Sequence, residues 1–408
     1  MRERWTWVAW FMAGALLMGS ALFGVYQIPW VKYRLEWRLD AAAGVVAGWL
    51  HPGETLPTPV HSAATPVILA NPDATSTRSP LAATGMPAPT PVPLAEAVSL
   101  PAPEWEKQDW NNCGPATLAL AMRYFGWEGD QYDISDLLKP DRADKNVNVE
   151  ELAYYVRTRA GWLNAEYRVA GYLETLKRFL AAGYPVVVEK SFVMAETEGG
   201  GWAAHYVLLT GYNDATRQFV TQDSYHGANL SVSYDDLEEC WRAFNHVYMV
   251  VFPAEDSEVI AGLLGDESDL DVNRERALER SQAEVATHDE DASAWFNLGS
   301  NLVYFERYAE AAQAFDTALS LGLPWRFTRY QFGPYLAYFH QGRYEDLIDL
   351  TTATLYRTSK SEEAMLWRGW ARFGMGDTWG ALEDFNAALE INPNYLDAQY
   401  AVDFVSGG

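Results

Sequence analysis

A recurring pattern of small and aromatic residues restricts the last third of the chain to one kind of architecture. One copy consists of Trp295, Leu298, Gly299, Ala311, Phe315 and Ala318, and the copy two periods later has Gly369, Ala381, Phe385, Ala388 and Pro393. Between them, a degenerate copy keeps Gly333 and Tyr344. Small residues at fixed offsets let two helices approach closely, and large aromatic side chains fill the groove between them. The pattern therefore predicts stacked helix pairs over 273–408.

These offsets resemble the tetratricopeptide signature, whose helix pairs stack into a superhelix. The resemblance implies an all-α repeat domain that recruits or positions a protein partner. A set of unrelated amphipathic helices is the alternative.

A proline-rich segment lies before these helices in the chain. The segment 51–103 holds 12 of the 20 prolines, interleaved with Ala, Thr, Ser and Val. Such a composition is typical of an extended, semi-rigid stalk, so we expect a disordered linker there. An acidic stretch at 255–272 is the second expected linker. A folded domain is expected between the two linkers, at 104–254.

An uncharged, apolar run from Trp5 to Val31 lies before the stalk, with basic residues on both sides. It is long enough to span a bilayer as a helix, so segment 1–50 is expected to be a membrane anchor. Alternatives are a signal peptide cleaved near Gly19 and Ala21, or a buried core helix. A stalk directly after an anchor favours an extracytoplasmic position for the rest of the chain.

Charge and cysteine content narrow the function. The formal net charge is −25 and the sequence has no block of Lys and Arg, whereas nucleic-acid binders depend on such blocks. We therefore expect no nucleic-acid partner. With only Cys113 and Cys240, a disulfide scaffold is excluded, although one bridge between them remains open. No metal-ligand spacing and no Gly-rich phosphate loop is visible, so no metal or cofactor is expected.

The pattern within 104–254 changes along the segment. Helical patterns cover 113–124 and 149–158, and short β-branched or aromatic runs then cover 185–188, 205–212, 217–221 and 246–252. Helices followed by an antiparallel sheet predict an α+β domain.

Cys113 stands at the start of the first helix, in the sequence Q-D-W-N-N-C-G-P-A-T. Pro115 fits the first helical turn, where no N–H donor is needed. Because a helix N-terminus stabilises negative charge, this position favours thiolate over thiol and predicts a nucleophile. The alternative for a lone cysteine is a small buried hydrophobic residue.

His205 and Asp223 lie on the two strands of a predicted hairpin, with turn residues Asn213 and Asp214 between them. The two side chains face each other directly only if the hairpin has an odd-length loop or a bulge. In that register the carboxylate would orient the imidazole while the ring activates the thiol. The alternatives are a hydrogen-bonded core histidine and a strand-end turn residue.

These motifs resemble the papain-like cysteine peptidases of the bacteriocin-leader, or double-glycine, type. The shared features, over about 105–253, are Gln then Cys-Gly-Pro-Ala at a helix start, His before an apolar strand ending in Gly-Tyr, and Asp on the next strand. The resemblance implies a papain-like fold with Cys113 as nucleophile, His205 as general base and acid, and Asp223 as the orienting group. It also implies Gln108 as an oxyanion donor, together with the Cys113 backbone N–H.

Two positions depart from the family pattern. Gln108 lies five residues before Cys113, where papain-type enzymes usually have six, so the asparagines at 111–112 are alternative amide donors. Asp223 precedes Ser instead of the frequent Pro.

For three further Cys and His residues, the surrounding sequence gives weaker evidence of a catalytic role. Cys240 is expected to lie on a helix and to pack in the hydrophobic core. His226 and His246 are expected to be surface or strand residues.

The sequence therefore predicts a membrane-anchored cysteine peptidase that hydrolyses a peptide or isopeptide bond. A non-catalytic envelope scaffold and a Cys-dependent acyltransferase are the alternatives. Hydrolysis and transfer differ only in whether water or an amine reaches the acyl-enzyme. Leader peptides are not expected as substrates, because the chain lacks the transporter domains to which leader-processing peptidases are commonly fused.

Overall fold

The computed structural model describes residues 2–28, 31, 35, 39, 46, 56–59, 94–194 and 201–407. The chain divides into two compact units, Met1–Pro52 and Gly53–Gly408. In the first unit, helix α1 (Arg2–Tyr26) forms where a helix was expected. None of the helices in the described ranges has both the length and the apolar character needed to cross a membrane. The membrane anchor expected for 1–50 stays a prediction from the sequence.

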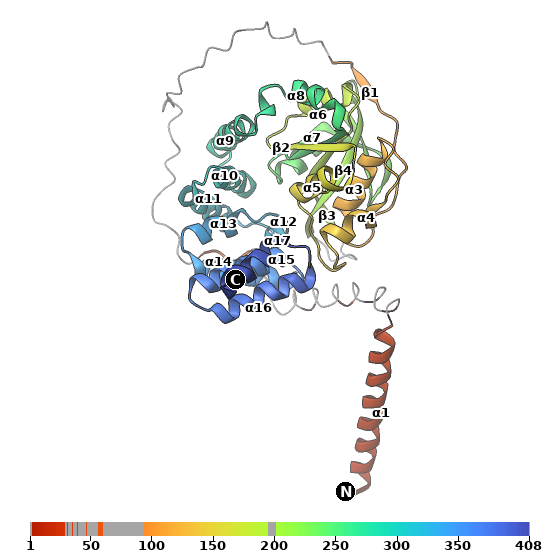
Figure 1. Cartoon of the computed structure of the whole chain (residues 1–408), viewed down its shortest axis with the longest axis vertical. Coiled ribbons are helices and arrows are strands. Elements are labelled where there is room, and N and C mark those ends of the chain that lie inside the picture. The colour runs from red at the N-terminus through yellow and green to blue at the C-terminus, as the bar shows by residue number, and fades with distance from the viewer. Residues whose placement is uncertain are drawn as a thin grey trace. The chain divides into compact units, whose positions relative to one another are not determined.

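A seven-stranded antiparallel sheet forms the core of the second unit, with strand order β2-β7-β3-β4-β5-β6 and β1 paired with β4 (Figure 1). The strands are β1 (Ala97–Ser99), β2 (Leu163–Arg168), β3 (Val186–Met194), β4 (Gly201–Asn213), β5 (Gln218–Asp223), β6 (Gly227–Ser233) and β7 (Tyr248–Pro253). Strands β3, β4, β5 and β7 confirm the four that were predicted. Sequence patterns missed β1, β2 and β6.

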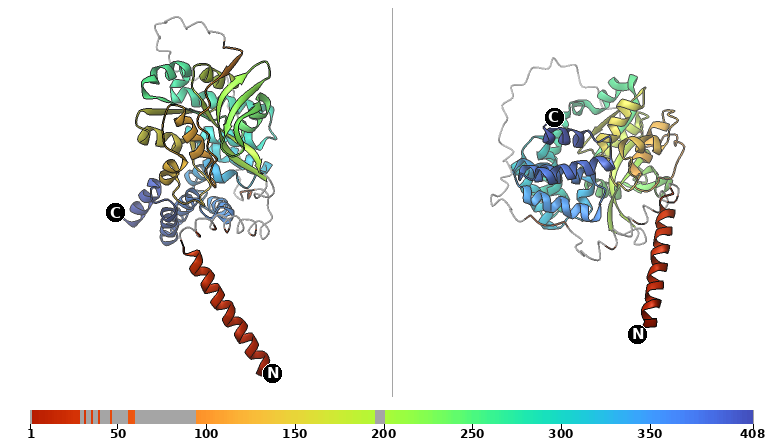
Figure 2. Two further views of the ribbon diagram at one scale, coloured as in Figure 1. Left: turned by 90° about the vertical axis from the view of Figure 1, so that its right-hand side faces the viewer. Right: turned by 60° about the horizontal axis from the view of Figure 1, so that its bottom comes forward.

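Both faces of the sheet are covered by helices (Figures 1 and 2). Helices α3 (Cys113–Arg123), α4 (Gln131–Leu138) and α5 (Val149–Arg159) share one core with Leu208 and Met249. Helices α6 (Leu173–Ala181), α7 (Tyr234–Arg242) and α8 (Ser257–Leu264) share the other with Leu209 and Val250. Successive strand residues point to opposite faces, so an apolar run such as 205–212 serves both cores. The predicted α+β class is confirmed.

Strand β1 belongs to the segment expected to be a disordered linker. Val98 of β1 pairs with Tyr212 of β4. A Cβ at Gly211 would stand 2.6 Å from the Val98 carbonyl oxygen, so glycine is needed for this close approach. Residues 94–103 are therefore part of the folded unit. Positions 51–55 and 60–93 of the expected linker lie outside the described residues.

The stretch expected to be an acidic linker, 255–272, is helical. It contains η2 (Ala254–Asp256), α8, η3 (Gly265–Ser268) and the start of α9 (Leu270–Thr287). Ile260 and Leu264 of α8 are buried in the core on one face of the sheet. The acidic residues are the solvent-facing side of this amphipathic stretch, which is why composition alone suggested a linker.

The C-terminal region is all-helical, as predicted. Its helices are α10 (Ala292–Tyr304), α11 (Tyr308–Leu321), α12 (Phe327–Tyr330), α13 (Gly333–His340), α14 (Tyr344–Arg357), α15 (Glu362–Gly374), α16 (Thr378–Ile391) and α17 (Leu396–Ser406). A Cβ at Gly299 would lie 2.6 Å from the ring of Phe315, and one at Gly369 would lie 2.4 Å from the ring of Phe385. The small and aromatic residues of the repeat pattern thus pack against each other. The tetratricopeptide assignment itself stays a prediction.

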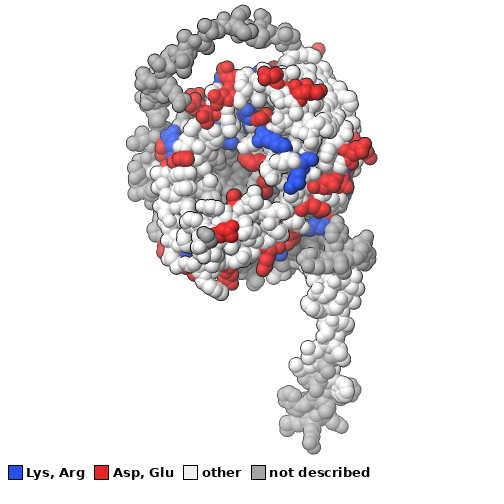
Figure 3. Space-filling model, viewed as in Figure 1, with Lys and Arg blue, Asp and Glu red and all other residues white. Residues whose placement is uncertain are grey.

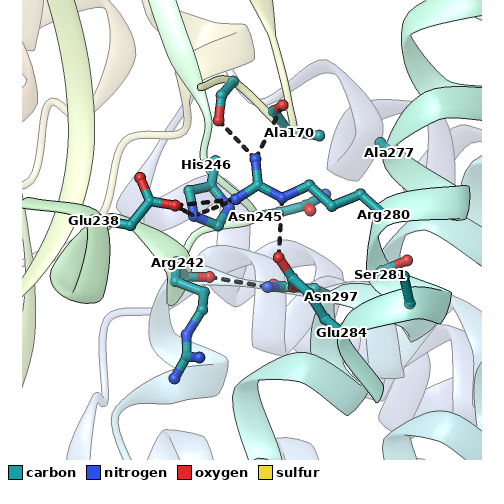
Figure 4. A network of polar contacts seen from close by, with 12 residues as sticks. Ala170, Glu238, Arg242, Asn245, His246, Ala277, Arg280, Ser281, Glu284 and Asn297 are labelled. Atoms are coloured by element: carbon teal, nitrogen blue, oxygen red, sulfur yellow. Dashed lines mark hydrogen bonds and ion pairs between the residues drawn. The ribbon is translucent and has the colours of Figure 1, made fainter. Parts of the chain in front are cut away.

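Arg280 of α9 joins these helices to the sheet domain. Its guanidinium donates to the Gly171 carbonyl at 2.8 Å, to Glu238 at 3.1 Å and to Glu284 at 2.9 Å. Figure 4 shows Glu238, the ring of His246 and the Arg280 guanidinium next to one another, with dashed lines from both nitrogen groups to Glu238. His246 is thus a buried structural residue, with Nε2 3.0 Å from Arg280.

A second junction is made of buried polar groups. Asp144 and Glu362 are buried near Lys139, and Glu363 is buried near Asp144. Lys139 and Asp144 come from the sheet domain, whereas Glu362 and Glu363 begin α15. Beside them, Asn392 donates a 2.9 Å hydrogen bond to the carbonyl of Leu138. The helical region is therefore packed into the sheet domain.

Candidate active site

Cys113 is the first residue of α3, as the sequence predicted. The hydroxyl of Thr117, one turn later, donates to the Tyr206 carbonyl at 3.0 Å and holds the start of the helix against β4. The Tyr206 backbone also lies close enough to Cys113 to lower the pKa of its thiol. Because Tyr206 follows His205 in the chain, Cys113 lies beside the strand position that carries the histidine.

His205 and Asp223 form a buried pair. Their Nε2 and Oδ1 atoms are 2.8 Å apart, and the side chains are 2% and 7% exposed. The backbone N–H groups of Tyr225 and His226 each donate to the same Asp223 oxygen at 2.9 Å. In the described part of the chain, no hydrogen bond is made by Nδ1 of His205. When Nε2–H donates to the carboxylate, Nδ1 carries the lone pair that can accept a proton.

The hairpin reaches this pairing in a register that was not expected. The four residues 214–217 form its loop, and a bulge interrupts the pairing of β4 with β5. Beyond the bulge, Leu208 pairs with Gln222. His205 is therefore a diagonal neighbour of Asp223, and the expectation of direct opposition is wrong. The contact still forms because a diagonal pair is within reach of a long side chain.

Gln108 lies next to this pair through Ser224, the residue after Asp223. The Gln108 backbone N–H donates to the Ser224 carbonyl at 2.9 Å, and the Ser224 hydroxyl donates to Gln108 Oε1 at 3.0 Å. The Gln108 amide nitrogen makes no hydrogen bond within the described ranges, so it is available as a donor. Asn112 donates instead to Gln131, and Asn111 to a backbone carbonyl. Gln108 is thus the one of these three amides whose nitrogen has no partner among the described residues, and its role as oxyanion donor stays a prediction.

His226 is a site residue that the sequence analysis missed. Its Nδ1 lies 2.9 Å from the second carboxylate oxygen of Asp223, and its side chain is 46% exposed. The ring of Phe192 lies 5.4 Å from His205 and 5.9 Å from His226, centroid to centroid. The spacing of three residues after Asp223, at the end of a strand, was the available signal, because a tight turn returns such a side chain to its start.

Burial sets the protonation states of the pair. Loss of solvation lowers the pKa of His205 and outweighs the opposing effect of Asp223. Burial would raise the pKa of Asp223, but hydrogen bonds from His205 and His226 outweigh this effect and lower it. At neutral pH the pair is therefore an uncharged imidazole and a carboxylate.

The Cys113 thiol differs from expectation. Burial raises the pKa of Cys113 to about 11, and the nearby Glu189 adds to the rise, while the Tyr206 backbone and Lys139 oppose it. Loss of solvation thus exceeds the stabilisation expected from the helix N-terminus. The resting group is a thiol, where a thiolate was predicted.

The other cysteine takes no part in this site. Cys113 and Cys240 are both free, so the bridge left open by the sequence does not form. Cys240 is partly buried in α7, and its carbonyl accepts a 3.3 Å hydrogen bond from Ser191.

The structure places Cys113 at the start of α3, beside β4, and pairs His205 of β4 with Asp223 at the end of β5. The sequence over the same region can be compared with known families. Residues 99–249 match the Peptidase_C39 like family. The range matched to this C39-like family contains Cys113, Gln108, His205 and Asp223. The match supports the peptidase-like fold predicted for 104–254.

Solved structures similar to the chain include two peptidases. A C39-like peptidase from Bacillus anthracis has 16% identity, with 39% of this chain and 98% of that chain covered and a TM-score of 0.31. The cysteine protease xylellain from Xylella fastidiosa has 15% identity, with 40% and 87% covered and a TM-score of 0.31. MamA from Desulfovibrio magneticus RS-1 has 16% identity, with 33% and 75% covered and a TM-score of 0.30. No curated protein matches the sequence.

Proposed function

We propose that this protein is a cysteine peptidase that hydrolyses a peptide or isopeptide bond with Cys113, His205 and Asp223. One observation carries the proposal. His205 of β4 and Asp223 of β5 form a buried pair 2.8 Å apart, and the backbone of Tyr206, the residue after His205, lies close enough to Cys113 to lower the pKa of its thiol. A thiol, a base and a group that orients the base are what nucleophilic acyl chemistry requires.

In the acylation step, Nδ1 of His205 accepts the thiol proton while the Cys113 sulfur attacks the carbonyl carbon of the substrate. Because the thiol is the resting form, proton transfer accompanies the attack. Asp223 stabilises the imidazolium that forms. The Gln108 amide and the Cys113 backbone N–H donate to the oxyanion.

The tetrahedral intermediate then collapses. The carbon–nitrogen bond breaks, the imidazolium gives its proton to the leaving amine, and a thioester remains on Cys113. Water attacks this thioester with His205 again as base, which releases the carboxylic acid and restores the thiol. If an amine reaches the thioester first, the same steps give acyl transfer.

The helices of the C-terminal region bind a protein partner in this proposal. Three aromatic side chains near its C-terminal end support such a role, since Trp379, Tyr400 and Phe404 are 76%, 62% and 55% exposed. Exposed aromatic residues are enriched where proteins bind other proteins. Attachment to a membrane through 1–50 and an extracytoplasmic location stay predictions from the sequence.

The proposal is tested by incubating the full chain with a complex peptide mixture and identifying new termini by mass spectrometry. We expect cleavage by the wild type, loss of cleavage in Cys113→Ala, and no loss in the matched variant Cys240→Ala. Products that carry an added amine in place of a new acid terminus would assign acyl transfer. Cleavage that survives in Cys113→Ala, or a wild type that neither cleaves nor reacts at Cys113 with an electrophilic peptide, would overturn the proposal.

A further inference from the structure

Three possible metal ligands meet at the edge of the candidate active site. His205, Asp223 and His226 each offer one atom, and these atoms all lie within 4.8 Å of one another. We propose that these side chains form a binding site for a divalent transition metal, of which Zn²⁺ is the test case, and that the bound ion inhibits the peptidase. Only the inhibition rests on the proposed function.

The donor set suits zinc. Two imidazole nitrogens and one carboxylate oxygen are ordinary zinc ligands, and three protein ligands leave one position open to water. At metal–ligand distances of about 2.0–2.2 Å, two ligands of a tetrahedral ion lie roughly 3.3 Å apart. The two present contacts of Asp223 join different oxygens: Oδ1 lies 2.8 Å from His205 Nε2, and Oδ2 lies 2.9 Å from His226 Nδ1. A single ion is therefore bound either by both oxygens or by one oxygen after the half-exposed His226 moves closer, starting from ligand atoms that lie within 4.8 Å of one another.

Two of the three ligand side chains are held in place, and the third faces solvent. Asp223 is held by the backbone N–H groups of Tyr225 and His226. His205 is packed against the ring of Phe192. His226 is half-exposed, which gives an ion a route from solvent. Ligands held in place by such outer contacts bind metal more tightly than mobile ones.

The charge of the protein also favours a cation. The formal net charge is −25, and Figure 3 shows acidic side chains scattered over the drawn face, with basic side chains among them. Lys190 opposes binding, since its charge acts on His205. The ionised carboxylate of Asp223 lies closer, because it is in direct contact with both rings.

Metal binding would stop the chemistry by changing a tautomer. A metal on Nε2 of His205 leaves the ring proton on Nδ1, so Nδ1 no longer has a lone pair for the Cys113 proton. His226 binds through Nδ1 and keeps its proton on Nε2. Each imidazole thus retains one proton, and Cys113 itself is not a ligand.

Zinc affinity is measured on the full chain carrying Cys113→Ala, by competition with a chromophoric chelator. We expect one bound Zn²⁺ at this site, at least tenfold weaker binding after His226→Gln, and unchanged binding after the matched substitution His288→Ala. Glutamine keeps a polar side chain beside Asp223, and the melting temperature confirms that the variant is folded. Binding that is lost in Cys113→Ala alone, or kept in full after His226→Gln, would overturn the site. This readout does not depend on peptidase activity.

Inhibition is tested on the chain with Cys113 intact. Zn²⁺ is expected to suppress peptide cleavage at the concentration that saturates the site, and a chelator is expected to restore it. His226→Gln should shift the inhibitory concentration upward by at least tenfold, whatever its own starting rate. A wild type that cleaves at full rate while one Zn²⁺ occupies the site would overturn the inhibitory role and leave the binding site standing.

Discussion

Asp223 makes the most polar contacts among the described side chains of the candidate site. One of its oxygens accepts hydrogen bonds from His205 and from two backbone N–H groups, and the other contacts His226. A carboxylate held in this way keeps its negative charge at neutral pH and fixes the tautomer of the ring it binds. The sequence predicts this residue at the end of a strand, and the structure has it as the last residue of β5. Its second histidine was not predicted, because the turn after the strand has no strong sequence signal.

Replacing Asp223 with Asn should reduce catalysis more than binding. The amide keeps the shape but can donate to Nε2, which favours the tautomer with its proton on Nδ1 and removes the base. We expect kcat to fall by about 10²- to 10⁴-fold with a small change in KM. Asp235→Asn is the matched control, since Asp235 is an exposed partner of Arg217. Equal kcat values for the two variants would contradict the role of Asp223.

The pKa of Cys113 predicts its labelling behaviour. Since burial raises this pKa to about 11, the thiolate fraction rises about tenfold per pH unit over the whole range below it. Iodoacetamide should therefore label Cys113 slowly at pH 7 and faster up to about pH 11. The unfolded chain should instead level off above its ordinary pKa of about 8.5. Fast labelling that does not change between pH 6 and 8 would indicate a resting thiolate and contradict this assignment.

At the scale of elements, the helix pairs depend on glycine at their contacts. Gly369 of α15 faces Phe385 of α16, and an added Cβ would stand 2.4 Å from the ring. Gly369→Ala should therefore lower the free energy of unfolding by about 1–3 kcal/mol, because the ring has to move. In the matched variant Gly262→Ala, nothing lies within 4 Å of the new methyl group, so the helix should be unchanged or slightly more stable. Urea unfolding of both variants measures the difference.

Elements with a strong local signal were predictable, and those fixed by distant partners were not. The helix at Cys113 follows from Pro115 and the apolar spacing after it. The repeat helices follow from Gly369, Phe385 and their counterparts. Strand β1 is three residues long and exists because Val98 finds the edge of β4. The register at His205 depends on a β-bulge, and no residue in the sequence indicates where that bulge lies.

At the scale of the whole molecule, the buried carboxylates between the sheet domain and α15 make stability depend on pH. Burial raises the pKa of Glu363 to about 8 and that of Asp144 to about 6, whereas unfolded carboxyl groups titrate near about 4. The folded chain thus holds these protons more tightly than the unfolded chain. Their stabilising contribution is complete below about pH 4 and is lost as the pH rises through about 8.

Glu363→Gln removes one of these titrations. We expect the melting temperature of the wild type to fall between pH 6 and 8.5, and that of the variant to fall less. Glu383→Gln, at an exposed position of α16, is the control and should keep the slope of the wild type. Parallel curves for all three proteins would show that Glu363 is ionised in the folded state.

Lys139 gives this junction a further consequence. Its ammonium group donates at 3.1 Å to the carbonyl of Asn111, two residues before the nucleophile, and its charge interacts with Asp144 and Glu362. Some of these contacts would be lost in a truncated chain. A fragment that stops after Pro253 would keep the whole nucleophile loop, yet Lys139 would lose Glu362, and the sheet would lose the cover of α8. We therefore expect a chain cut after Pro253 to unfold more readily than the full chain, because the helices beyond it supply part of the packing and charge around the sheet domain.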